Sequence, residues 1–256
     1  MNWFKTDGGW IKLVSIGLLL MLWYIAAWAP AKPIFPPPHV VAGYLIADVQ
    51  KWAIWSHLIV TLTRIVLGFA LAMAVAVPFG ILLGFSKTAQ KLFGSWVVIG
   101  LMTPSLVFII LAYTSIGLNE LAAVIAAALA VVWVLTINIW ESAKAVDNKL
   151  IQMARVFKQP MSKIVTRIIL PQLAAPLMAS ARFGLGLIWK MVLFVELLGR
   201  SNGIGYQIEY YYQLFDLGRV LEYTVFFVAV MLLIEVVILG SIEKRLFRWR
   251  PATRIA

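Results

Sequence analysis

The chain has 256 residues, 62% of them hydrophobic, and its mean hydropathy is +0.92. This composition indicates a membrane protein without a separate soluble domain. The formal net charge of +11 would suit a nucleic-acid-binding protein, but the basic residues are distributed as they are in a membrane protein. The absence of cysteine excludes disulfides, thiol catalysis and cysteine-ligated metal.

Six apolar stretches are long enough to cross a hydrocarbon core of about 30 Å as helices. Four of them contain uncharged runs of at least 19 residues, at 13–31, 65–86, 92–119 and 121–140, and the fifth and sixth contain isolated charges. We therefore predict an all-α membrane protein that forms a single transmembrane domain over residues 1–256. Its expected spans are at about 13–31, 58–85, 92–116, 121–140, 171–196 and 223–242.

The basic residues predict the orientation of these spans. If the N-terminus is cytosolic, the inward segments hold fifteen Lys and Arg residues. The outward segments, with the first one counted over 32–64, hold five: Lys32, Lys51, Arg64, Arg200 and Arg219. This excess on the inner side places both termini in the cytosol. The segment 141–170 then faces the cytosol, and the loops 32–57 and 199–222 face outward.

The N-terminal region imitates a signal peptide, because Lys5 and Lys12 precede an apolar run that ends at Ala27-Trp28-Ala29, which resembles a cleavage site. We expect no cleavage, since the run is too long for the apolar core of a signal peptide. After it, KPIFPPP (32–38) is stiff and extended. The stretch 40–55 then has the pattern of an amphipathic helix whose tryptophans suit the headgroup region.

The second and third spans each contain a distinctive feature. Gly80 and Gly84 form a G-x-x-x-G step, which would let another helix approach closely. Thr103-Pro104-Ser105 interrupts the third span, and Pro104 should bend it. Such a bend fits either an ordinary kinked span or a helix that lines a transport pathway.

The segment 141–170 is a basic, polar island between two apolar spans. It contains two short amphipathic patterns, which Gln159-Pro160 separates. Leu150, Met153, Ala154 and Phe157 fall on one helical face, and Met161, Ile164, Val165, Ile168 and Ile169 fall on another. A helical hairpin displayed in the cytosol suggests a binding partner.

Charges within the last two spans are costly, so they usually face the bundle interior or extend to an interface. Arg182 lies deepest, and either a pathway role or a structural polar contact fits it. Lys190 and Glu196 are six residues apart and are not neighbours on a helix. Glu196 is close enough to the outer end to extend to the interface. Glu235 is a candidate buried carboxylate. It could have a role in transport, or it could form an ion pair with a Lys or Arg residue.

The outward loop 199–222 is aromatic and interrupted by glycines, and it is too polar to cross a membrane. We expect it to contain a short helix at the interface, with its tyrosines at headgroup level. No metal-binding, hydrolase or ATP-binding motif occurs in the chain. A transporter of this sequence would therefore take its energy from a partner or from an ion gradient.

Four motifs follow one another along almost the whole chain. FPPPHVV (35–41) follows the first span, and residues 57–86 fit the pattern H-x-x-x-S-L-x-R-x-x-x-G-F with Thr61 in place of Ser. Residues 168–199 fit V-x-L-P-x-A-x-P-x-I-x-x-G-L-R with a following Trp and Glu, and a G-x-G motif comes next. The following Trp and Glu are Trp189 and Glu196, and the G-x-G motif is Gly203-Ile204-Gly205.

In this order the chain resembles the permease subunits of binding-protein-dependent ABC importers, in the nitrate, taurine and aliphatic-sulfonate class. The resemblance implies the importer permease fold in a bacterial inner membrane and pairing of two permeases, expected to be a homodimer. It also implies a dimer of ATP-binding cassette ATPases and an external solute-binding protein as partners. The ATPase would bind the ATP, so this chain would be neither an enzyme nor the holder of a cofactor or metal.

The resemblance also assigns candidate residues. The coupling helix that docks into the ATPase would lie within 152–162, where the family has E-A-A-x-x-x-G. Here Gln152-Met153 replaces Glu-Ala, Lys158 stands at the usual Gly, and only one proline of three remains near the pathway. The coupling candidates are Gln152, Met153, Ala154, Arg155, Phe157, Lys158 and Ser162, and the pathway candidates are Pro104, Arg182, Trp189, Lys190, Glu196 and Glu235.

Two other functions remain open at this stage. An ion-driven carrier would need inverted repeats and several buried ionisable groups, and no repeat is evident in the sequence. A membrane scaffold that recruits a cytosolic partner would account for the segment 141–170, but it would leave the broken third span unexplained. A basic pathway would suit an anionic substrate.

Overall fold

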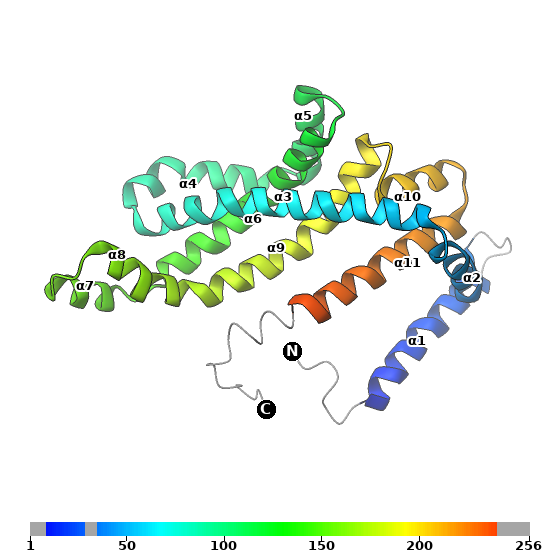
Figure 1. Cartoon of the computed structure of the whole chain (residues 1–256), viewed down its shortest axis with the longest axis horizontal. Coiled ribbons are helices and arrows are strands. Elements are labelled where there is room, and N and C mark those ends of the chain that lie inside the picture. The colour runs from blue at the N-terminus through cyan, green and yellow to red at the C-terminus, as the bar shows by residue number, and fades with distance from the viewer. Residues whose placement is uncertain (1–8, 29–34, 240–256) are drawn as a thin grey trace. The chain divides into compact units, whose positions relative to one another are not determined.

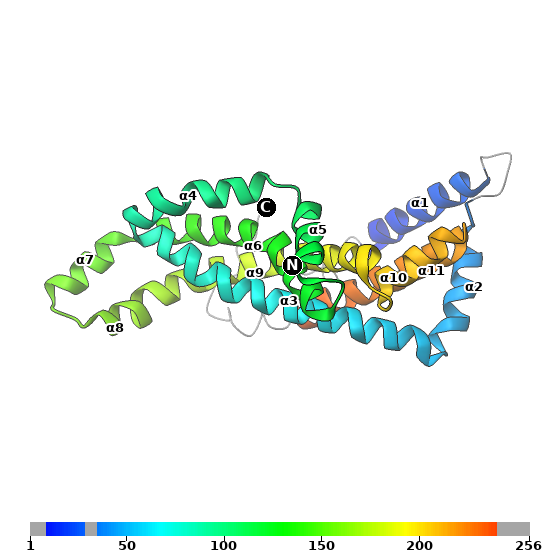
Figure 2. The same cartoon turned by 90° about the horizontal axis from the view of Figure 1, so that it is seen from above.

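The computed structural model describes residues 9–28 and 35–239, and every regular element within them is a helix (Figures 1 and 2). The expected all-α class is confirmed. The terminal tails lie outside the described residues, as do the ends of the predicted spans 13–31 and 223–242 and part of the segment 32–38. The chain forms two compact units, residues 61–201 and the segments on either side of them.

The larger unit contains most of the long helix α3 and all the elements up to α9. They are α3 (Trp52–Phe85), α4 (Lys87–Met102), α5 (Ser105–Ile116), α6 (Glu120–Lys144), α7 (Asn148–Val156), α8 (Met161–Ile164), the π-helical turn η1 (Val165–Ile169) and α9 (Leu170–Gly199). The helix α6 is the central element, because it contacts α4, α5 and α9 and is buried along most of its length.

Small residues let α3 pack closely against α6. A Cβ atom added to Gly84 would lie 2.3 Å from the Cβ atom of Ala143, and one added to Gly80 would lie 2.8 Å from the Cβ atom of Ile139. The predicted close contact at the G-x-x-x-G step is therefore present. Such contacts bring two helices together through van der Waals packing, which lipid cannot replace.

The helices α4 and α5 are bent by 97° at Thr103-Pro104. Pro104 cannot donate a backbone hydrogen bond, and it holds Thr103 in an extended conformation, with φ −74° and ψ 127°. The predicted break is confirmed, and it is much sharper than an ordinary kink. It makes this pair either one broken span or a re-entrant turn.

The hairpin of α7 and α8 lies at one end of this unit, beyond the ends of α6 and α9 (Figures 1 and 2). Its buried side chains join a hydrophobic cluster at the base of those two helices. Gln159-Pro160 separates α7 from α8, as predicted. The second amphipathic pattern is not a separate helix, however, because α8, η1 and α9 follow one another without a break from Met161 to Gly199.

The smaller unit contains α1 (Gly9–Trp28), α2 (Pro38–Val49), the start of α3, α10 (Ile204–Gln213), α11 (Leu217–Leu233) and η2 (Ile234–Leu239). The helix expected within 199–222 is present as α10, and its place at the membrane interface stays a prediction. The helix expected over 40–55 is wrong in its extent, because the chain leaves the helix at Gln50-Lys51 and α3 begins at Trp52. Lys51 instead pairs with Asp48 at the end of α2, 2.6 Å away.

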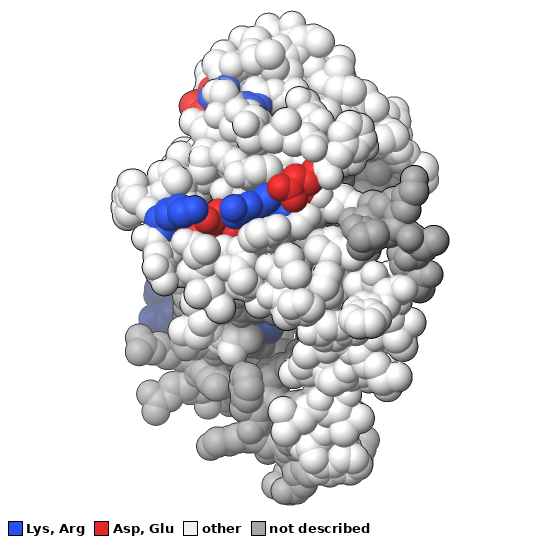
Figure 3. Space-filling model, turned by 90° about the vertical axis from the view of Figure 1, so that its right-hand side faces the viewer, with Lys and Arg blue, Asp and Glu red and all other residues white. Residues whose placement is uncertain are grey.

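An ion-pair cluster joins α2 to α11 in this unit. Arg219 lies 2.6 Å from Asp48 and 2.8 Å from Glu222, a fully buried carboxylate. Burial by itself would raise the pKa of the Asp48 carboxyl, but the hydrogen bond from Lys51 and the charge of Arg219 outweigh it, and the pKa is lowered. Figure 3 shows basic and acidic side chains side by side on a face with few other charges.

Three helices in the described residues are long and apolar enough to cross a membrane: α3, α6, and α11 extended to Val237. The bent pair α4–α5 makes a fourth if it is a single span. The helix α9 is 30 residues long but carries Arg182, Lys190 and Glu196. The count of six spans therefore stays a prediction.

We expect Gly84→Ala to destabilise the protein by about 1–3 kcal/mol, because the added methyl group forces α3 away from Ala143. Thermal melting of the purified protein in detergent should show a loss of about 3–10 °C. The matched control is Gly186→Ala in α9, where nothing lies within 4 Å of the added atom. Equal melting temperatures for the two variants would contradict the close contact.

Candidate functional site

A buried arginine lies at the centre of the larger unit's polar interior. The side chain of Arg64, on α3, is 2% exposed. Its Nη1 atom donates to Glu196 Oε1 at 2.7 Å, and its Nε and Nη2 atoms donate to the two carboxylate oxygens of Glu120 at 2.8 and 2.6 Å. The second arrangement is bidentate, the strongest geometry for an arginine–carboxylate pair.

Glu196, on α9, is 0% exposed and has two partners on α3. Besides Arg64, the hydroxyl of Thr61 donates to its Oε2 atom at 3.0 Å. The expectation that Glu196 extends to the interface is therefore wrong. A carboxylate can stay in the interior because the charge and hydrogen bonds of α3 compensate for its lost hydration.

A second arginine completes the network at the end of α9. Arg200 pairs with Glu120 through Nη2 and donates from Nη1 to the carbonyl oxygen of Leu118 at 3.0 Å. Nearby, the hydroxyl of Tyr113 donates to the carbonyl oxygen of Val195 at 2.8 Å, and Gly199 leaves room for the tyrosine ring. Two arginines and two glutamates thus join α3, α6 and α9 without net charge.

The ion pairs of this network connect three helices. Each carboxylate pairs with an arginine of another helix or helix end, Glu196 with Arg64, and Glu120 with Arg64 and Arg200. No group of three or more potential metal ligands occurs among residues 9–28 and 35–239.

The sequence analysis missed three of the four charged residues in this network. The distribution of basic residues places Arg64 and Arg200 among the outward-facing charges. Glu120 lies directly before the predicted span 121–140, in an outward segment. One signal could have identified Arg64, because it is the Arg of the motif in residues 57–86 and lies one helical turn after Thr61.

A second candidate site is the apolar tip of the α7–α8 hairpin. Val156 is 80% exposed and Phe157 is 68% exposed, and Met153 and Met161 are also exposed. Among the predicted coupling residues, Ala154 is buried, and the other six are exposed: Gln152, Met153, Arg155, Phe157, Lys158 and Ser162. We call Met153, Val156, Phe157 and Met161 the hairpin tip.

The predicted apolar face of α7 is only partly correct. Ala154 packs into the cluster at the base of the hairpin, together with Ile151, whereas Leu150, Met153 and Phe157 are exposed. The helix therefore has apolar residues on two sides, one for the core and one directed outward. Exposed apolar groups in such number usually mark a contact surface.

The turn after α7 has a left-handed backbone conformation at a position that glycine usually occupies, and here the residue is a lysine. Lys158 has φ +50°. Its N–H donates to Arg155 O at 2.9 Å, and the N–H of Gln159 donates to Ala154 O at 3.0 Å. These two hydrogen bonds are those of a Schellman turn, in which the left-handed position usually holds glycine. A residue with a Cβ atom costs about 1–2 kcal/mol there.

The remaining predicted pathway residues do not form one cluster. Arg182, Trp189 and Glu196 follow one another at seven-residue intervals and so share a face of α9. Arg182 and Trp189 are half-buried, whereas Lys190 is exposed on another side and lies 5.7 Å from the ring of Trp189. Pro104 is exposed at the bend before α5. Glu235 is exposed, so the expectation of a buried carboxylate is wrong.

Comparison with known proteins identifies the family. Residues 76–249 match the family described as binding-protein-dependent transport system inner membrane component. The chain belongs to this family. The match includes the bend at Pro104, the hairpin tip and all of α9.

Relatives of this permease align over most of its length. A probable ABC transporter permease protein from Brucella abortus is 26% identical over 96% of this chain and 98% of its own. A putative aliphatic sulfonates transport permease protein from Bacillus subtilis is 26% identical, covering 94% and 88%. A taurine transport system permease protein from Escherichia coli is 27% identical, covering 77% and 75%. The chain is thus a multi-pass inner-membrane permease of the ABC transporter class.

We expect Arg64→Met to destabilise the permease by about 3–5 kcal/mol, because it leaves Glu196 buried without its charged partner. Thermal melting in detergent measures the loss. The double variant Arg64→Met/Glu196→Gln should recover part of it, since the uncompensated charge is then gone. Lys190→Met, at an exposed position of α9, is the control. A single variant no less stable than this control would refute a stabilising role for the network.

Proposed function

We propose that this permease forms the membrane pathway of an ATP-driven importer for a small organic or inorganic anion. The substrate would be a sulfonate, taurine or nitrate, delivered by an external solute-binding protein. Two copies would pair in the membrane with both termini in the cytosol, and a dimer of ATPase subunits would bind the ATP. This chain itself would need no cofactor.

The hairpin tip carries this proposal. Its apolar side chains are exposed at the end of a hairpin whose base is packed into the larger unit. The basic side chains of Arg155 and Lys158 lie beside them and are also exposed. An apolar centre with a charged rim is typical of a protein-binding surface, so the tip fits a groove on an ATPase subunit.

The continuous helix from Met161 to Gly199 supplies a connection from the tip to the pathway. Its first turn belongs to the hairpin, and its last turns contain Glu196 of the ion-pair network. The helix is unbroken, although it contains the π-helical turn η1 and Pro176, so displacement at the tip would be transmitted towards the network. We propose that ATP-driven motion enters the membrane domain through this helix.

Phe157→Asp should reduce recovery of the ATPase at least tenfold when the permease is affinity-purified from native membranes, because it places a charge in the apolar centre of the tip. Quantitative mass spectrometry of the purified complex measures the ratio of the subunits. Asn148→Asp is the matched control, since it adds the same charge at the exposed start of α7.

An unchanged ratio in Phe157→Asp would move the docking contact away from the tip. Recovery of the wild-type chain without any ATPase, both with and without nucleotide, would contradict the ATP-driven mechanism. Flux assays under an imposed ion gradient would then test the carrier alternative.

The proposed class of substrate rests on the similarity to the aliphatic sulfonates and taurine permeases and on the half-buried Arg182. Arg182→Ala should lower uptake of radiolabelled taurine or an alkanesulfonate about tenfold while the complex still assembles, because an anion loses its partner in the pathway. Lys163→Ala removes an exposed charge outside the spans and is the control. Loss of assembly in Arg182→Ala would assign this residue a structural role instead.

A further inference from the structure

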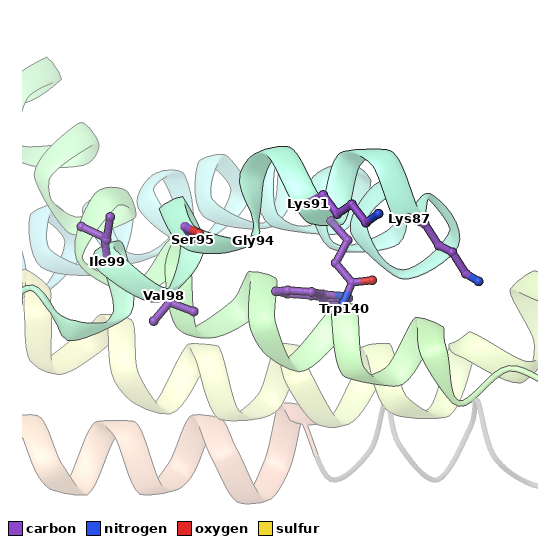
Figure 4. A pocket seen from close by; sticks show the side chains of 8 residues that line it. Lys87, Lys91, Gly94, Ser95, Val98, Ile99 and Trp140 are labelled. Atoms are coloured by element: carbon purple, nitrogen blue, oxygen red, sulfur yellow. The ribbon is translucent and has the colours of Figure 1, made fainter.

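A groove of about 730 Å³ opens between α4 and the end of α6. Its lining changes in character along its length. Lys87, Gln90 and Lys91 lie in the first turns of α4, and Val98 and Ile99 lie three turns further along the same helix. Figure 4 shows the two lysines at one end and Val98 and Ile99 at the other, with the ring of Trp140 between them.

The charged end of the groove lies where two candidate membrane spans end. The helix α3 ends at Phe85, directly before the turn into α4, and Trp140 lies one turn before the end of α6. If α3 and α6 span the membrane, Lys87 and Lys91 lie at its surface, and Val98 and Ile99 lie within the hydrocarbon. The distance from Lys87 to Val98 along the helix axis is about 17 Å, close to half of a hydrocarbon core of about 30 Å.

Nothing in the described structure neutralises the charged end. Neither Lys87 nor Lys91 forms an ion pair with a carboxylate of residues 9–28 or 35–239. A third lysine, Lys144, lies 4.4 Å from the ring of Trp140 and pairs with Glu141. The positive end of the groove is therefore available to an anion.

One hydrogen-bond donor beside the groove has no partner. Trp140 is 7% exposed, and its indole N–H has no partner among the described residues. A buried donor of this kind usually bonds to water, an ion or a ligand. Gly94 has no side chain, so the backbone of α4 lies close to the tryptophan ring here. A Cβ atom at this position would lie 3.2 Å from the ring.

We propose that this groove binds one anionic phospholipid of the surrounding membrane. Lys87 and Lys91 hold its phosphate, and an acyl chain lies along Trp140, Val98 and Ile99 to the depth of one leaflet. A free anion would use only the charged end, and a neutral lipid would leave the lysines uncompensated. Basic pockets between membrane helices bind anionic headgroups for the same electrostatic reason.

The test is thermal melting of the purified permease in detergent with added phosphatidylglycerol, and with phosphatidylcholine of the same acyl chains for comparison. Native mass spectrometry of the same samples counts the bound lipids. Phosphatidylglycerol should stabilise the protein at lower concentration than phosphatidylcholine and remain as one adduct per permease chain. Lys87→Gln/Lys91→Gln should raise the half-saturating concentration about tenfold or more, and Lys87→Arg/Lys91→Arg should leave it close to that of the wild type.

Lys149→Gln/Lys163→Gln removes the same charge from exposed positions on the hairpin and is the matched control. If the glutamine variant at 87 and 91 does not fold, Ser95→Phe provides a second test, because it fills the groove without changing its charge. It should weaken binding of phosphatidylglycerol by a similar factor.

Four results would overturn the proposal. One is equal stabilisation by the two lipids, and another is an equal loss in the control at 149 and 163. The third is equal stabilisation by glycerol 3-phosphate, which would indicate a site for free anions. A permease dimer that dissociates in the variant at 87 and 91, with no dependence on lipid, would also overturn it, since the groove would then be a contact between subunits.

Discussion

A buried guanidinium group is the constraint around which the larger unit is organised. Arg64 can stay in an apolar interior only because Glu196 and Glu120 reach it from α9 and α6. The three helices cannot slide or rotate independently without leaving one of these charges without a partner, which costs several kcal/mol. The network therefore fixes the register of the helices, a task that uniform apolar packing in lipid performs poorly.

Close packing of helices on α6 adds to the stabilisation that the ion pairs provide. The glycines of α3 let it approach α6 along one side, and the alanine-rich surface of α6 receives its other neighbours. The break at Thr103-Pro104 turns the chain sharply, so that α4 and α5 contact different parts of α6. The rigid centre and the single long helix from Met161 to Gly199 together suit a protein in which a distant tip must move a membrane segment.

The sequence predicted the features that depend on local chemistry. Proline determined both the break at Pro104 and the separation of α7 from α8, and hydropathy determined the helical membrane class. It could not predict the ion-pair network, because its members are 56 and 132 residues apart and a single sequence does not show which charges meet. The buried side of α7 was also ambiguous, since apolar residues lie on two sides of this helix.

The left-handed turn at Lys158 has a practical consequence. Its backbone leaves the helix at an exposed corner, and the bond that follows joins a lysine to Gln159. Exposed, non-helical corners are preferred sites of limited proteolysis, and trypsin cuts after lysine. A partner that covers the hairpin tip would also cover this bond. The permease thus carries a built-in indicator of whether its tip is occupied, which brief digestion of intact membranes can display without any label.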